Sequence, residues 1–116
     1  MNEYDIINFE NRLMANVFAK RPVVITRGKG ALVWDIKGKE YIDCMGSYGV
    51  ALLGHSHPKI VEAVCKQAEM LISCHASLYN NKRTEFLQKL MSITPRGLNK
   101  AFLSNSGAEA VECAIK

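Results

Sequence analysis

The stretch Ala101–Ala110, with the sequence AFLSNSGAEA, constrains the fold more than any other part of the chain. A short apolar run predicts the end of a buried strand, Asn105–Gly107 break it, and Ala108, Val111 and Ile115 then give one apolar helical face. A strand that enters a helix through so tight a turn leaves the first backbone N–H groups of the helix unpaired, and the helix dipole adds partial positive charge there. The stretch therefore predicts an anion site suited to a phosphate.

The side chains of this turn agree with a phosphate site, although they have a simpler explanation. Gly107 and Ala108 are small enough to let a phosphate oxygen reach the backbone, and the Ser106 hydroxyl can donate one more hydrogen bond. Ser106 and Glu109 also form the pattern of a capping box, which needs no ligand and is the commoner arrangement. In either case we expect the Glu109 carboxylate to turn back to the N–H of Ser106, because it would repel a phosphate otherwise.

Composition sets broad limits on the rest. With 48% hydrophobic and 22% charged residues, the 116-residue chain is expected to form one modest core. Its net charge of +4 is scattered, and no basic run or aromatic-interleaved patch suggests a nucleic acid. The start of the chain lacks the features of a signal peptide and no apolar run reaches membrane-spanning length, so we expect a cytoplasmic protein without membrane contact.

Four cysteines do not form the spacing of a disulfide framework, so reduced and partly buried thiols are expected. The three histidines add ligand types, but no Cys-x-x-Cys or spaced histidine pair accompanies them, and we expect no metal site. The residues concerned are Cys44, Cys65, Cys74, Cys113, His55, His57 and His75.

The first half of the chain predicts a helix followed by a small sheet. Residues 3–18 have an apolar side at helical spacing. Residues 23–26, 31–35 and 41–43 predict three short strands separated by glycine-containing turns at 28–30 and 37–39, which is typical of a β-meander.

Residues 44–58 form a glycine-rich stretch with few charges. Such a loop can line a pocket, where Tyr48 would offer an aromatic wall, or it can cross a buried domain or subunit interface. We interpret His55 and His57 as hydrogen-bonded turn residues before Pro58 rather than as proton-transfer groups.

Helical spacing continues over 58–72 and again over 84–93, with the polar, irregular segment 73–81 between them.

Four motifs in order resemble the class III aminotransferases, enzymes of fold type I that use pyridoxal 5'-phosphate (PLP). They are GALVWD with GKEYID, GVALLGH with HP, and NSGAEA with its following helix, and the resemblance runs from about Pro22 to Lys116. The chain looks most similar to acetylornithine aminotransferases and to aminotransferases that act on carrier-protein-linked aminoadipate semialdehyde. The resemblance implies an α/β fold.

Several roles follow from the resemblance. It implies that Ser106, Gly107 and Ala108 hold the cofactor phosphate and that Tyr48 contacts the substrate. It makes Tyr79 a second substrate-wall candidate, the alternative being a half-buried loop tyrosine with its hydroxyl in water. A homodimer is implied as well.

The lysine that would hold the cofactor aldehyde and the acid that would pair with the pyridine nitrogen lie downstream in this family. None of the lysines here occupies the expected context, and Lys116 matches the lysine that ends the phosphate-binding helix, so we assign no catalytic residue. We expect an amino-terminal piece of a longer enzyme, inactive by itself. Its expected parts are a helical segment (1–20), a small-domain β-meander with the glycine-rich loop (21–54), connecting helices (55–98), and the first strand and helix of the large domain (99–116).

The resemblance implies transfer of the terminal amino group of an acetylornithine-like or carrier-linked lysine or ornithine precursor to 2-oxoglutarate, in arginine or lysine biosynthesis. A small amino-group carrier protein is a further partner that it allows. Another class III ω-aminotransferase remains open. A glutamate semialdehyde aminomutase is disfavoured, because that group usually has Ser-Trp-Gly where this chain has Ser47-Tyr48-Gly49. A non-catalytic phosphate-binding module is the alternative from a different class.

Overall fold

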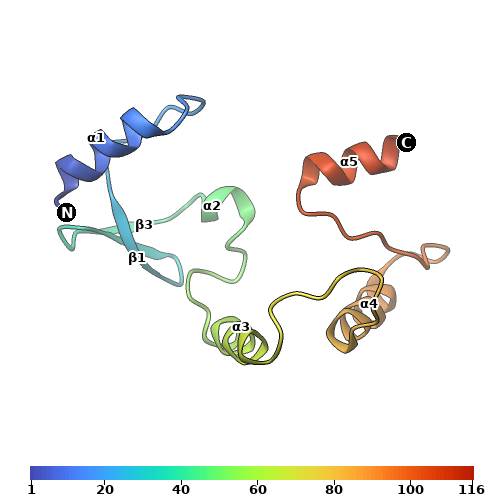
Figure 1. The fold of residues 1–116 in the computed structure, drawn as a ribbon. Coiled ribbons are helices and arrows are strands. Elements are labelled where there is room, and N and C mark those ends of the chain that lie inside the picture. Colours follow the sequence, from blue (N-terminus) through green and yellow to red (C-terminus); the bar gives the residue numbers. More distant parts are fainter. The chain divides into compact units, whose positions relative to one another are not determined.

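The computed structural model describes residues 1–116 and divides them into two units, Met1–Ile72 and Ser73–Lys116. Figure 1 shows their elements, coloured along the chain.

Helix α1 (Glu3–Leu13) begins the first unit. A capping box starts it: the Asn2 side chain accepts from the Asp5 N–H at 2.9 Å, and the Asp5 carboxylate accepts from the Asn2 N–H at 3.4 Å. The helix is shorter than the predicted 3–18, because Met14 is already extended and the N–H of Val17 bonds to the carbonyl of Ala15. Val17 is 71% exposed, so no packing holds this segment helical.

Strands β1 (Ile25–Lys29), β2 (Leu32–Asp35) and β3 (Glu40–Ile42) pair antiparallel in the order β1-β2-β3, which confirms the β-meander. The β1–β2 register pairs Lys29 with Leu32, so the connection consists of two residues, 30–31. The turn predicted at 28–30 is therefore wrong for its first two residues, which belong to β1. An irregularity interrupts the register between Ile25 and Arg27. Beyond it, the Arg27 guanidinium lies 4.0 Å from the ring centroid of Trp34, its partner in the register.

Asp35, at the end of β2, is the one residue of the chain that is buried, with 6% of its surface exposed. Its carboxylate accepts from the N–H groups of Lys37 and Lys39, both at 2.9 Å, and from the Tyr41 hydroxyl at 2.8 Å. Burial alone would raise the pKa of Asp35, but these hydrogen bonds outweigh it and hold the pKa below its usual value. Asp35 thus fixes the β2–β3 turn.

The loop after β3 contains α2 (Gly46–Gly49), a single turn, and leads to α3 (Pro58–Met70). Proline at the first helical position starts α3 as predicted.

The second unit contains α4 (Asn81–Ile93) and α5 (Gly107–Ile115). The Asn80 side chain caps α4 by accepting from the Arg83 N–H at 2.9 Å, so the helix begins three residues before the predicted start. Residues 101–104, predicted as a strand, are not one. A strand requires a hydrogen-bonded neighbour, and this unit contains no other strand to pair with it.

No hydrophobic side chain is buried, so the expected modest core is absent. The apolar side of α3 illustrates this, because Ile60, Val61 and Val64 are 48% to 62% exposed. The chain forms amphipathic elements, but its own residues do not cover their apolar faces.

Candidate functional site

The N-terminus of α5 presents free backbone donors. The N–H groups of Ser106, Gly107 and Ala108 have no hydrogen-bond partner, and all three residues are exposed. The Ser106 oxygen accepts from the Glu109 N–H at 3.2 Å, which leaves the hydroxyl hydrogen available to donate elsewhere. Three N–H groups and one O–H at a helix N-terminus form a cradle for an anion.

Gly107 is the open position in this cradle. A Cβ added there would meet nothing within 4 Å, so packing inside the chain does not require a glycine. The space beside the Gly107 backbone therefore stays open.

The Glu109 carboxylate accepts from the N–H of Asn105 at 2.8 Å. The predicted partner, the N–H of Ser106, is therefore wrong by one residue, and α5 lacks the reciprocal half of a capping box. This shift leaves the Ser106 N–H free within the cradle.

In the other unit, α2 is a left-handed turn that holds Tyr48. Gly46, Ser47, Tyr48 and Gly49 have φ of 51°, 53°, 56° and 86°. A non-glycine residue in this region costs roughly 1–2 kcal/mol, so Ser47 and Tyr48 are both strained. The Tyr48 side chain is 90% exposed, and neither it nor the fully exposed Tyr79 makes a hydrogen bond. The half-buried alternative for Tyr79 is wrong.

Asp43 and His55 close the loop that carries this turn. His55 Nε2 lies 2.7 Å from Asp43 Oδ2, and the same carboxylate accepts from the N–H groups of Met45 at 2.9 Å and Gly46 at 3.0 Å. The hydrogen bond with His55, followed by those from the two N–H groups, holds the pKa of Asp43 below its usual value. His55 is thus a hydrogen-bonded turn residue, as predicted.

His57 differs from the prediction. Its backbone carbonyl accepts from the N–H groups of Ile60 and Val61, both at 3.0 Å, but its buried ring Nδ1 has no partner. It lies beside an apolar groove between residues 50–54 and α3.

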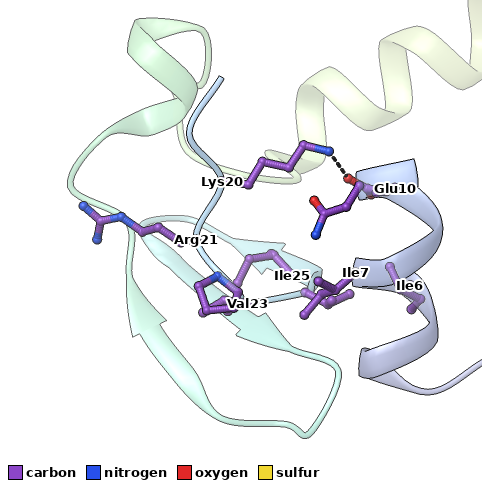
Figure 2. Close-up of a pocket in the computed structure, with 10 residues that line it drawn as sticks. Ile6, Ile7, Glu10, Lys20, Arg21, Val23 and Ile25 are labelled. Atoms are coloured by element: carbon purple, nitrogen blue, oxygen red, sulfur yellow. Dashed lines mark hydrogen bonds and ion pairs between the residues drawn. The ribbon is translucent and has the colours of Figure 1, made fainter. Parts of the chain in front are cut away.

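Figure 2 shows a second pocket of the first unit, between α1 and the segment before β1. Ile6 and Ile7 line it together with Val23 and Ile25, and an ion pair of 2.9 Å joins Lys20 to Glu10 at its edge. None of the site residues predicted from sequence lines this pocket.

The four cysteines are unpaired, and Cys44, Cys65 and Cys113 are exposed rather than partly buried. The His, Cys, Asp and Glu side chains form no group that could hold a metal ion. None of the helices is both long and apolar enough to cross a membrane.

Comparison with known proteins decides the family, because the family model described as aminotransferase class-III matches residues 14–116. The chain belongs to the class III aminotransferases. It is 50% identical over 107 residues to the [LysW]-aminoadipate semialdehyde transaminase of Deinococcus radiodurans, which covers 92% of this chain and 25% of that protein. It is 48% identical over 101 residues to the acetylornithine aminotransferase of Methanopyrus kandleri, covering 87% and 26%.

A solved structure agrees with this class III assignment. The acetylornithine aminotransferase of Elizabethkingia anophelis matches with a TM-score of 0.92 and 43% identity, covering all of this chain and 30% of that one. The predicted fold class is confirmed. The chain spans 25% to 30% of the length of these relatives.

Class III aminotransferases depend on PLP, and the cradle of α5 fits the phosphate of that cofactor. The fit rests on the free N–H groups and on the space at Gly107. The small-residue turn is the sequence feature from which these residues were predicted to bind the phosphate. Sequence reasoning missed Asp43, because nothing in the pattern near this residue indicates that its partner, His55, lies 12 residues later in the chain.

Proposed function

We propose that this chain is the amino-terminal part of a class III aminotransferase that moves the terminal amino group of an acetylornithine-like or carrier-linked lysine or ornithine precursor to 2-oxoglutarate, in arginine or lysine biosynthesis. The names of the relatives support the two donor classes. Such an enzyme is expected to be a cytoplasmic homodimer. The carrier-linked donor would bring a small carrier protein as partner. The 116 residues by themselves are expected to be inactive.

The observation that carries the proposal is the open cradle at the start of α5. Ser106, Gly107 and Ala108 offer three free N–H groups, and no side chain of this chain occupies the space at Gly107. When bound, PLP supplies an electron sink for cleavage of a bond at the amino-bearing carbon of the donor. The part of this chain is to hold the phosphate, so that the reactive end of the cofactor keeps a fixed position.

Tyr48 in the first unit and Tyr79 in the second are each proposed to contact the amino donor. Both are fully or nearly fully exposed and make no hydrogen bond, so both rings are free to contact a substrate. A flat apolar ring with a polar tip suits a donor that has a methylene chain and polar ends.

Gly107→Val in the complete protein tests the cradle. The added side chain blocks the free N–H groups without removing the Ser106 cap, whereas Ser106→Ala would also weaken the helix. We expect the affinity for PLP to fall about tenfold or more. Ala114→Val, the same kind of change in the last turn of α5, is the matched control.

The measurement compares two ligands by titration of the cofactor absorption. PLP binding should weaken in Gly107→Val, while binding of pyridoxal, which has no phosphate, should not change. Equal losses for both ligands, or no loss for PLP, would contradict the phosphate assignment.

A further inference from the structure

The position of Tyr48 is set by the backbone alone. Its side chain is 90% exposed and makes no hydrogen bond, so nothing but the left-handed turn Gly46–Gly49 directs the ring. A strained turn persists only where its surroundings over-determine it. Contacts elsewhere in the loop must therefore hold this turn.

Asp43 holds the beginning of the turn. One carboxylate oxygen accepts from the N–H groups of Met45 at 2.9 Å and Gly46 at 3.0 Å, and the Asp43 N–H donates to the carbonyl of Ala31 at 2.8 Å. The loop is thereby fixed to the β-meander where it starts.

His55 holds the end of the loop. Its backbone pairs with Gly30 in both directions, at 2.9 Å and 2.8 Å, and its ring reaches back to Asp43 at 2.7 Å. The two ends of the loop are thus joined to each other by side chains and to the sheet by main chain.

Close packing leaves the linked residues Asp43 and His55 little freedom to shift. A Cβ added at Gly28 would lie 2.7 Å from both Cβ and Cγ of His55, and one added at Gly54 would lie 2.8 Å from Cα of Gly30. The backbone at Gly28 therefore approaches the His55 side chain, and the backbone at Gly54 approaches Gly30, as closely as a glycine permits.

We propose that Asp43 and His55 are positioning residues for the amino donor, because they close the loop 44–54 and so hold Tyr48 in the left-handed turn that presents its ring. This inference rests on the proposed function, in which Tyr48 contacts the donor. Without the side-chain link between Asp43 and His55, the turn relaxes and the ring is no longer held in one place.

The test uses the complete aminotransferase with PLP, with N-acetylornithine as amino donor. His55→Ala is expected to raise the KM for the donor about tenfold, with kcat and PLP affinity changed less than about twofold. His55→Gln is expected to restore the KM to within about twofold, because its amide nitrogen reaches the place of the ring Nε2 and donates to Asp43. Glu62→Gln, which breaks an exposed ion pair with Lys66 on α3, is the control and should leave the KM unchanged.

A double-mutant cycle shows whether the effect passes through Tyr48. In a Tyr48→Ala background, His55→Ala should add nothing further to the KM. If the two changes multiply, or if His55→Ala leaves the KM unchanged, the positioning role is overturned. Should His55→Ala fail to fold, Gly28→Ala displaces the ring with the imidazole retained; a raised KM supports the role and an unchanged KM overturns it. A wild-type protein that binds no PLP and uses no donor would instead overturn the proposed function.

Discussion

Residues 1–116 expressed alone are expected not to fold cooperatively. The chain exposes 10544 Å², whereas a folded monomer of its mass of 12.9 kDa exposes about 6,300 Å². With somewhat more than half of that surface apolar, the excess of about 4,200 Å² corresponds to about 60 kcal/mol of hydrophobic stabilisation that is not gained. Hydrophobic burial and conformational entropy are each of order 100 kcal/mol for a folded domain and leave a net stability of only about 5–15 kcal/mol, so a loss of this size leaves the entropy cost of folding uncompensated.

The assay follows far-UV circular dichroism and the fluorescence of the single tryptophan, Trp34, against urea. We expect both signals to drift without a shared sigmoidal transition, since β2 has no buried apolar layer to report on. Coincident transitions with a slope of about 1–3 kcal/mol per molar urea would show a cooperative unit and refute the reasoning from exposed surface.

Two further predictions concern the complete protein. Ser47→Gly should raise the free energy of unfolding by up to about 1 kcal/mol, because relief of the left-handed strain exceeds the added entropy of the unfolded chain. Ser92→Gly, inside α4, is the control and should lower the free energy of unfolding. A thermal melt in which both variants shift in the same direction would contradict the strain at Ser47. Tyr41→Phe should raise the pKa of Asp35, as followed by carboxylate NMR titration, because the hydroxyl donor is lost. Since the folded-state pKa of Asp35 is lowered, its stabilising contribution is present above the ordinary value of 3.8 and is lost as pH falls through the folded-state pKa. In Tyr41→Phe the contribution of Asp35 should be smaller and its loss should be complete at a higher pH, and an unchanged titration would count against the role of the hydroxyl.

Sequence reasoning predicted elements whose signals are local. Pro58 marked the start of α3, and Ser106 with Gly107 marked the start of α5, because caps and first-turn residues act within a few positions. Strand β1 was placed too early, over 23–26 instead of Ile25–Lys29, since pairing with β2 and not the apolar run decides its position.

Features that depend on distant partners could not be predicted. The left-handed turn at Ser47 and Tyr48 opposes the conformational preference of both residues. It is held by Asp43, whose side-chain partner His55 lies 12 residues farther along the chain. The strand expected at 101–104 failed for the same reason, because an apolar run does not provide its own neighbour.

Asp35 and Asp43 show how a chain without a buried core still keeps defined local shape. Each carboxylate closes a strand end, accepts from two backbone N–H groups that follow it, and binds one side chain from farther along, Tyr41 or His55. Such hydrogen bonds orient a turn, but each contributes only about 1 kcal/mol net, so they do not replace hydrophobic burial. Local geometry and global stability therefore have different sources in this protein. The Asp35 carboxylate shapes the β2–β3 turn and the Asp43 carboxylate shapes the loop that presents Tyr48, whereas the exposed apolar faces of helices such as α3 require further surface to cover them.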